Sequence, residues 1–427
     1  MKEIVEAKFK EIFGTEGRYK TYFAPGMVNL MGDNTEHNGG YTLSYTVKRG
    51  TYATVRERED RIINFYSANV EELGILSFSI DNLVLVYDPD EKWINYPKSI
   101  ILTLKNEGFN IDHGFDIVYY TDIPKGIGLS LVASIEVLTA NIMNDIYSLD
   151  IDNGKIASIC KKAEKEYMER NGRITDQFII ANNKKNYAIL LNTATLEYQY
   201  IRANLENKKI VIINTKSRKE AEEAKYNVRR IEIDTALEEL QRENPNITSL
   251  VELTDEEFEE NKEAIKDEIT RKRAKFVVYE NQRTLKAAQA LKENNSELFG
   301  TLMQESQNSL KYDYEVIDTD IDKLVEITLK QKGTLATRKI NARLSNTVIS
   351  IVDENMVEKF ISNVEKEYIG TTGNSIRFYI EEIKEKLNVW KSEKNEHNRN
   401  RFRKFNYKDD KYEWRRTNPK YTNVKQN

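Results

Sequence analysis

Oxygen-bearing side chains cluster in a short stretch near the start of the chain. Residues 25–40 read Pro-Gly-Met-Val-Asn-Leu-Met-Gly-Asp-Asn-Thr-Glu-His-Asn-Gly-Gly, and Asp33, Asn34 and Glu36 lie near its middle. Ionised carboxylates pair well with hydroxyl groups because they only accept hydrogen bonds and have several lone pairs. The stretch is consistent with a site for a polar ligand, and equally with a polar loop that binds nothing.

Two further segments carry candidate functional groups. Residues 124–134 read Pro-Lys-Gly-Ile-Gly-Leu-Ser-Leu-Val-Ala-Ser, and the apolar residues of 130–147 have helical spacing. The chain contains no Gly-x-x-x-x-Gly-Lys-Ser/Thr sequence, which excludes a P-loop. Asp176, in Thr-Asp-Gln-Phe, could act as a base toward a hydroxyl group, or could form only local hydrogen bonds.

These segments together resemble galactokinases, a branch of the GHMP small-molecule kinases. The first motif of that family runs Pro-Gly-Arg-Val-Asn-Leu-Ile-Gly-Glu-His-Thr-Asp-Tyr-Asn-Gly-Gly. The likeness covers roughly residues 10–384, and its motifs recur in order at 93–98, 175–178, 225–230, 271–280 and 303–316. It implies an α+β, two-lobed GHMP kinase fold, with a ribosomal-S5-like α/β N-terminal lobe and a ferredoxin-like α+β C-terminal lobe.

The coarse pattern of the chain agrees with this architecture. Strand-like runs are predicted at 41–56, 62–67, 187–191, 198–201, 209–213 and 347–352. Helices are predicted at 93–106, 130–147, 220–298 with a break at 244–246, 297–310, 320–329 and 356–368. We therefore expect an N-terminal lobe over residues 1–200, a C-terminal lobe over 201–385 and a tail over 386–427.

Several residues that do chemistry in the family are replaced here. The resemblance assigns Asp176 to the catalytic aspartate and places Met27 where the family has an arginine that stabilises negative charge. Residues implied to face the sugar are Asp33, Asn34, Glu36, Arg173 and Tyr226. Arg173 replaces a glycine, so it could restore positive charge near Asp176, or could pair with Asp176 and fill the sugar pocket.

The phosphate-binding motifs differ most. The family loop Gly-Leu-Ser-Ser-Ser-Ala is Gly-Leu-Ser-Leu-Val-Ala here, and the last serine, a Mg²⁺ ligand in the family, is Val132. Glu164 remains at the second metal-ligand position. Residues 339–347, aligned with the glycine-rich third motif, contain no glycine. The residues implied to bind nucleotide are Ser67, Trp93, Tyr96, Gly126, Gly128 and Ser130.

These losses predict a pseudokinase that keeps a sugar-binding, sensor or regulatory role toward galactose or a related sugar. The first alternative is an active, divergent galactokinase or sugar kinase that transfers the γ-phosphate of ATP to the C1 hydroxyl of galactose. ATP and Mg²⁺ are expected as cofactors only if the protein is active, and no cofactor is expected otherwise. The second alternative is an interaction protein that acts through its tail.

Composition is that of a cytoplasmic protein. The 427 residues are 39% hydrophobic and 31% charged, include one cysteine, and show neither a signal peptide nor a membrane-spanning run. Residues 391–427 hold twelve Lys or Arg against five Asp or Glu, interleaved with aromatic residues. Such a tail could contact protein or nucleic acid, or could be a solvated extension. We expect no membrane contact and a monomer.

Overall fold

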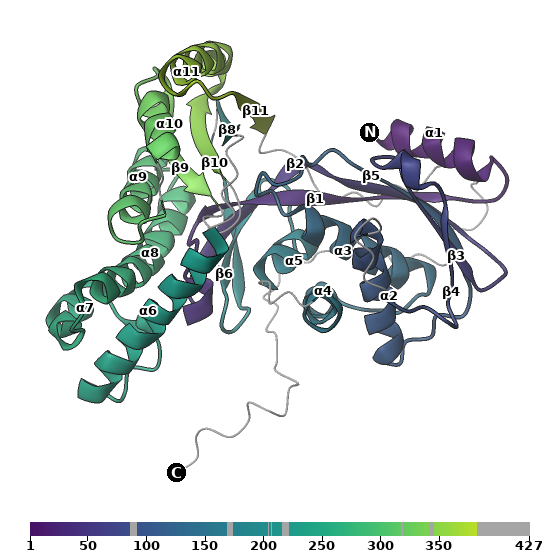
Figure 1. The fold of residues 1–427 in the computed structure, drawn as a ribbon, viewed down its shortest axis with the longest axis horizontal. Helices are drawn as coiled ribbons and strands as arrows, with labels where there is room; N and C mark the ends of the chain where they lie inside the picture. Colours follow the sequence, from purple (N-terminus) through teal and green to yellow (C-terminus); the bar gives the residue numbers. More distant parts are fainter. Residues whose placement is uncertain are drawn as a thin grey trace. The chain divides into compact units, whose positions relative to one another are not determined.

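The computed structural model describes residues 1–85, 92–168, 174–203, 205, 207–215, 222–316, 319–340 and 346–381. These residues belong to one compact unit, and Figure 1 shows their helices and strands. The tail predicted for 386–427 lies outside the described residues, as do Arg173 and residues 341–345 of the third motif.

The first sheet has seven strands among the described residues, in the order β4-β3-β5-β2-β6-β7 with β1 paired to β2. They are β1 (Lys20–Met31), β2 (Tyr41–Glu57), β3 (Ile62–Ser67), β4 (Leu76–Ser79), β5 (Phe115–Thr121), β6 (Tyr187–Asn192) and β7 (Tyr198–Arg202). β3 and β5 pair in parallel, and the other pairs are antiparallel. β1 is buried along almost its whole length, so it can carry side chains into the interior.

Helices cover both faces of this sheet. α1 (Lys2–Phe13) lies on one face, and Figure 1 shows α2 (Asn95–Asn106), α3 (Leu131–Ile146), α4 (Asn153–Tyr167) and α5 (Ile174–Ala181) gathered on the other. The buried residues of α3 include Ala133, Val137 and Ala140, whose spacing of three to four residues forms an apolar stripe. That stripe packs into one hydrophobic core with the inner face of the sheet.

The second sheet has the order β11-β8-β10-β9, and all its pairs are antiparallel. Its strands are β8 (Lys208–Thr215), β9 (Thr334–Ile340), β10 (Thr347–Asp353) and β11 (Ile376–Glu381). Successive side chains of a strand point to opposite faces. Val211 and Ile213 accordingly pack against α10 (Thr319–Leu329) and α11 (Val357–Thr372), whereas Ile210 and Ile212 join the core on the other face.

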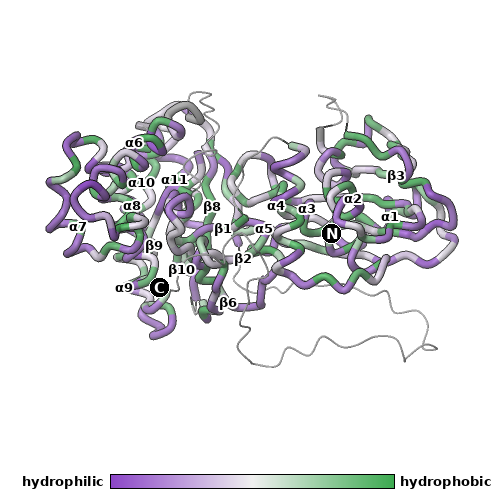
Figure 2. The backbone as a smooth tube through the Cα atoms, turned by 90° about the horizontal axis from the view of Figure 1, so that it is seen from below, coloured by the Kyte–Doolittle hydropathy of each residue, from purple (hydrophilic) through white to green (hydrophobic). Residues whose placement is uncertain are grey.

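Within the described residues, three long helices and one short helix follow the first strand of the second sheet. They are α6 (Glu222–Glu243), α7 (Asp255–Asn261), α8 (Glu268–Lys292) and α9 (Ser296–Tyr312). The predicted break at 244–246 is present. The chain does not return at once to a long helix as predicted: a 3₁₀ turn, the short α7 with its Thr254–Glu257 capping box, and another 3₁₀ turn occupy 250–264. In Figure 2 the segment around α7 is largely hydrophilic.

The predicted α+β class with two sheets is therefore confirmed. The predicted division of the lobes at residue 200 stays a prediction. Across the described part of the chain, no helix combines the length and apolar character needed to span a bilayer.

Candidate active site

A small cleft lies where β1, the start of α3, the start of α5 and the end of β9 meet. Its walls are formed by Met27, Asn29, Asp33, Gly128, Ser130, Thr175, Asp176 and Ile340. The cleft thus joins the 25–40 stretch, the glycine-containing loop and the predicted catalytic aspartate, which are far apart in sequence. Met27, Asp33, Gly128, Ser130 and Asp176 are all residues that the sequence singles out.

Asp176 is tied directly to the glycine-containing loop. Ser130 is the N-cap of α3 and has a left-handed backbone with φ of 56°. Its side chain does not cap its own helix but donates from Oγ to Oδ2 of Asp176 at 2.7 Å. The N-terminus of α3 favours nearby negative charge. The aspartate is therefore fixed at a position where a negative charge is stabilised.

Strand β1 holds the loop in place through its backbone. The backbone N–H of Met27 donates to the carbonyl oxygen of Leu129 at 3.3 Å. A Cβ atom added at Gly26 would lie 2.7 Å from that same oxygen, so only glycine permits this approach. The loop also uses φ of +80° at Gly126 and +77° at Gly128. Its shape therefore depends on backbone contacts more than on the side chains at positions 131 and 132.

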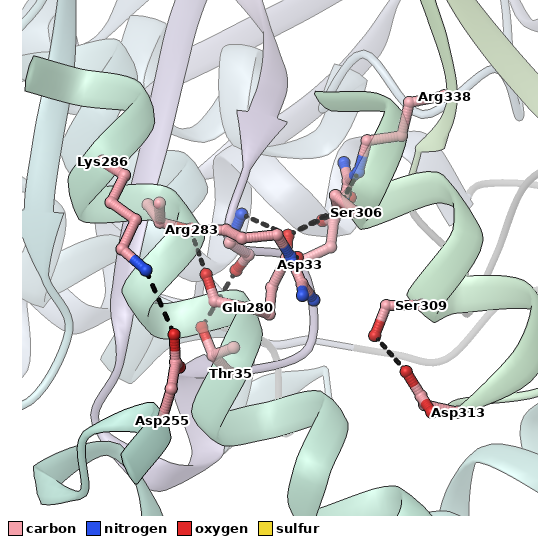
Figure 3. A network of polar contacts seen from close by, with 12 residues as sticks. Asp33, Thr35, Asp255, Glu280, Arg283, Lys286, Ser306, Ser309, Asp313 and Arg338 are labelled. Carbon is pink, nitrogen blue, oxygen red and sulfur yellow. Dashed lines mark hydrogen bonds and ion pairs between the residues drawn. The ribbon is translucent and has the colours of Figure 1, made fainter. Parts of the chain in front are cut away.

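A buried ionic network supports the other wall of the cleft (Figure 3). Arg338 on β9 and Glu280 on α8 are fully buried, and Asp33 is 1% exposed. Nη1 of Arg338 donates to Oδ2 of Asp33 at 3.0 Å, and its Nη2 donates to Oε1 of Glu280 at 3.3 Å. Oε1 of Glu280 also accepts from the N–H of Gly32 at 3.0 Å and from Ser306 at 2.8 Å. The network joins the 25–40 stretch to α8, α9 and β9.

The remaining predicted sugar residues lie farther along the same stretch. Asn34 has a left-handed φ of 68°, and its buried Nδ2 has no partner within the described part of the chain. Tyr226, near the start of α6, is hydrogen-bonded to His37. Burial raises the pKa of Tyr314, and the nearby Tyr226 and Glu36 raise it further. Glu36 and Tyr226 thus belong to one cluster, although neither lines the cleft.

Three of the residues predicted to bind nucleotide, Ser67, Trp93 and Tyr96, lie apart from the glycine-containing loop in sequence. Ser67 ends β3 beside Tyr119 of β5, and the ring of Trp93 meets Tyr119 edge-on at a centroid distance of 5.8 Å. Nε1 of Trp93 is buried and has no partner among the described residues. Tyr96 lies in the first turn of α2. A buried indole N–H without an acceptor is the kind of group that a bound heterocycle could satisfy.

The predicted metal residues meet only part of the requirement for Mg²⁺. Val132, in the first turn of α3, offers no oxygen, whereas Glu164 on α4 is a carboxylate only 6% exposed. Burial raises the pKa of the Cys160 thiol, and the charges of Glu136 and Glu164 raise it further. The described residues contain no group of three or more His, Cys, Asp or Glu able to hold a metal. One carboxylate is still compatible with Mg²⁺, which is commonly held by one or two carboxylates together with substrate phosphates.

Sequence reasoning missed several residues of the site. Asn29, Thr175 and Ile340 line the cleft, but the sequence gives them no role beyond the framework of their motifs, and it does not single out His37. Arg338 stands out in the sequence only as the residue before the third motif, and the partner that makes it important is 305 positions away. Only knowledge of which residues distant in sequence are in contact could have revealed the role of Arg338.

Comparison with known proteins accounts for this arrangement. Residues 7–57 match the family model for the galactokinase galactose-binding signature, and residues 95–184 match that for the GHMP kinases N-terminal domain. A galactokinase of Clostridium beijerinckii is 43% identical over 380 residues, which cover 89% of this chain and 97% of that protein. This chain belongs to the galactokinase family. The resemblance seen in the sequence is thereby confirmed.

Further relatives support the same assignment. A galactokinase of Ligilactobacillus salivarius is 42% identical over 382 residues, covering 90% of this chain and 98% of that protein. The crystal structure of Lactococcus lactis galactokinase complexed with galactose has a TM-score of 0.83 and 36% identity, covering 91% of this chain and 99% of that one. A mevalonate kinase at 20% identity and a TM-score of 0.59 shares the GHMP fold. None of these comparisons supports loss of activity, so the predicted pseudokinase is unconfirmed and an active galactokinase fits them better.

Proposed function

We propose that this chain is an active galactokinase that transfers the γ-phosphoryl group of ATP to the C1 hydroxyl of galactose. The observation that carries the proposal is the composition of the cleft. It brings Asp33 of the galactose signature, Gly128 and Ser130 of the glycine-containing loop, and Asp176 to one site. Phosphoryl transfer needs positioning and charge stabilisation more than covalent work by the protein, and these residues supply both.

On the sugar side, the polar residues of the signature provide the contacts. Asp33, Asn34, Glu36 and Tyr226 are proposed to bind the hydroxyl groups of galactose, and the unpartnered amide of Asn34 is a ready donor. Asp176 is proposed to accept the proton of the C1 hydroxyl as that oxygen bonds to phosphorus. The bond between phosphorus and the oxygen of ADP breaks in the same transfer. Ser130 holds Asp176 in place at 2.7 Å.

On the phosphate side, the start of α3 provides the contacts. Because the side chain of Ser130 is directed to Asp176, it leaves the first-turn N–H groups of α3 without a side-chain cap. Such groups, together with the helix dipole, bind phosphate. Space around Gly126 is open, since a Cβ atom added at that residue would have no other atom within 4 Å. Backbone groups therefore perform this role even though Leu131 and Val132 replace serines.

The remaining ligands of the nucleotide are assigned in the same way. Ser67, Trp93 and Tyr96 are proposed to line the adenine site. Glu164 is proposed to hold Mg²⁺ together with the phosphates of ATP, and the metal when bound would supply neutralisation of phosphate charge. Arg173 and the basic tail lie outside the described residues, so their roles toward Asp176 and toward protein or nucleic acid stay predictions. Cytoplasmic location and a monomeric state stay predictions as well.

The test is formation of galactose 1-phosphate, followed by ³¹P NMR with purified full-length protein, MgATP and galactose. We expect turnover by the wild type and a fall in kcat of roughly 10²- to 10⁴-fold in Asp176→Asn, since that is the usual contribution of a general base. Thermal unfolding of both proteins is the control for folding. Absence of turnover in the folded wild type would refute the proposal, and galactose binding without turnover would favour the second candidate.

A sugar-binding pseudokinase is the second candidate, and one observation favours it. Met27, 3% exposed, contributes an uncharged thioether to the cleft that holds Asp176, and a thioether cannot neutralise developing phosphate charge. The double variant Met27→Arg/Val132→Ser separates the two candidates. A pseudokinase should bind galactose without turnover and gain activity in the variant. If the protein is an enzyme with a rearranged site, the wild type should be active and the double variant should show no increase in activity.

A further inference from the structure

Asn29 occupies the cleft wall and has no role in the family-based assignments above. We propose that Asn29 is a sugar-specificity residue: its amide donates a hydrogen bond to one hydroxyl oxygen of galactose, and Asp33, backed by Arg338, fixes the amide in that orientation. The inference rests on the proposed function, because galactose is the ligand. It adds a hydrogen-bond donor to the proposed galactose site. It also gives a reason for the buried charges that contact residues 32 and 33.

The orientation of the Asn29 amide follows from its two neighbours. The side chain is 8% exposed and lines the same cleft as Asp176. Its Nδ2 donates to Oδ1 of Asp33 at 2.9 Å, and its Oδ1 accepts from Oγ of Ser44 at 3.0 Å. An ionised carboxylate can only accept hydrogen bonds, so the amide atom facing Asp33 must be the nitrogen. The amide cannot flip without losing both bonds.

One hydrogen of that amide remains available. An asparagine side chain carries two N–H donors on Nδ2, and the bond to Asp33 uses one of them. Within the described part of the chain, Nδ2 of Asn29 makes one hydrogen bond, the one to Asp33. Because Asn29 lines the cleft, an oxygen of a bound ligand is the acceptor that this donor can reach. A buried donor without an acceptor is unfavourable, so the bound ligand relieves it.

A second layer holds Asp33 itself. The other oxygen of Asp33 accepts from the fully buried Arg338 at 3.0 Å. Nε of Arg338 donates to Ser306 at 2.8 Å, and its Nη2 donates to Glu280 at 3.3 Å (Figure 3). The guanidinium is thus held by partners on α8 and α9 as well as by the loop. Arg338 is a positioning residue in this arrangement. Asp33, besides its proposed contact with galactose, orients the amide of Asn29.

Calorimetric titration with galactose and with each monodeoxygalactose tests the proposal. Asn29→Ala should raise the Kd for galactose roughly 10- to 100-fold, as expected for loss of one buried donor to a bound oxygen, and should leave the Kd for MgATP within twofold. One deoxy sugar lacks the hydroxyl that Asn29 contacts. The wild type should bind this sugar more weakly than galactose, whereas Asn29→Ala should bind the two with equal affinity. Asp33→Asn should lose discrimination against that same deoxy sugar, which a merely structural defect would not do.

Asn144→Ala is the matched control. Asn144 lies in the last turn of α3, and its side-chain amide makes two hydrogen bonds, of 2.8 and 2.9 Å, to the backbone of Ile151 after the helix. Its removal should therefore lower stability without changing sugar selectivity. If Asn29→Ala does not fold by thermal unfolding, Asn29→Ser replaces it. The proposal is overturned if the folded variant binds galactose within twofold of wild type, if all deoxy sugars still lose affinity, or if MgATP affinity falls instead. A wild type that does not bind galactose overturns the proposed function itself, and that result is visible before any variant is made.

Discussion

The two walls of the cleft are built by different means. The wall proposed to bind galactose, called the sugar wall below, depends on paired charges: Arg338 and Glu280 are fully buried, and Asp33 is bonded to Arg338 across 305 residues of sequence. The wall proposed to bind phosphate, called the phosphate wall below, depends on backbone: the carbonyl of Leu129 packs against Gly26 and accepts from the N–H of Met27. Among the described residues, no ion pair joins the glycine-containing loop to β1.

This difference explains which substitutions the family fold has accommodated here. A wall built from backbone contacts keeps its shape when side chains change, so Leu131 and Val132 can replace serines without moving the amides of α3. A wall built from buried charges cannot lose one partner, because the remaining charge would be left uncompensated. By the motif resemblance Arg338 matches the family, whereas residues 339–347 after it contain none of the expected glycines.

The largest effect is expected from breaking the charged wall. Arg338→Met should lower the free energy of unfolding by about 3–5 kcal/mol, because Asp33 and Glu280 would remain buried without their cation. Denaturant unfolding at neutral pH measures it. The control is Arg61→Met: the Arg61–Asp81 pair is 44% and 56% exposed, and solvent screens such a pair so that its removal should change stability little. Equal losses in the two variants would show that burial of the network is not what matters.

A smaller effect is expected from crowding the backbone wall. Gly26→Ala places a methyl group 2.7 Å from the oxygen of Leu129, and such overpacking typically lowers stability by about 1–3 kcal/mol. Because the loop must shift, the Kd for MgATP should also rise. Gly370→Ala is the matched control, since α11 leaves nothing within 4 Å of that position, and alanine should stabilise a helix there by about 0.5–1 kcal/mol. Unchanged stability in Gly26→Ala would mean that the loop adapts freely.

Much of the fold was readable from local pattern. Strands β3 and β6 and helices α3 and α9 were predicted to within a few residues because their apolar spacing is strong. The prediction of continuous helix over 250–264 was wrong. Charged residues with high helix propensity do not reveal where an N-cap such as Thr254 begins a new, short helix.

The residues of the candidate site that belong to recognisable motifs could be predicted from the sequence. The residues that matter only through contacts with distant parts of the chain could not. The motif resemblance selected Asp33, Gly128, Ser130 and Asp176, and the cleft contains all four. Asn29 carries no signal by itself, because an amide in a buried strand matters only once its neighbours are known. The network around Arg338 joins four elements, and neither periodicity nor spacing encodes such contacts.

The smallest effect concerns Glu381 and Arg49, an ion pair whose carboxylate interacts electrostatically with Asp122, just before the glycine-containing loop. Glu381 on β11 is 2% exposed; it accepts from the N–H of Lys48 at 3.1 Å and pairs with Arg49 at 2.7 Å. Burial raises the pKa of Glu381 in spite of Arg49, and burial likewise raises the pKa of Asp122 at the start of the loop. A raised carboxyl pKa means that the folded state binds the proton more tightly than the unfolded state. The contribution to stability is then full below the ordinary value and is lost as pH rises through the raised pKa.

Glu381→Gln isolates this effect because the amide resembles the protonated acid and does not titrate. The free energy of unfolding of the variant minus that of the wild type should increase as pH rises from the ordinary carboxyl pKa of 4.5 toward neutrality. Glu107→Gln is the control of opposite sign: burial favours its neutral form, but hydrogen bonds from Lys155 and Lys162 hold the pKa of Glu107 below its ordinary value. Wild-type stability from Glu107 is therefore lost as pH falls. A Glu381 difference with the same slope as the Glu107 difference would mean that Arg49 outweighs burial, and that the phosphate wall also relies on a paired charge.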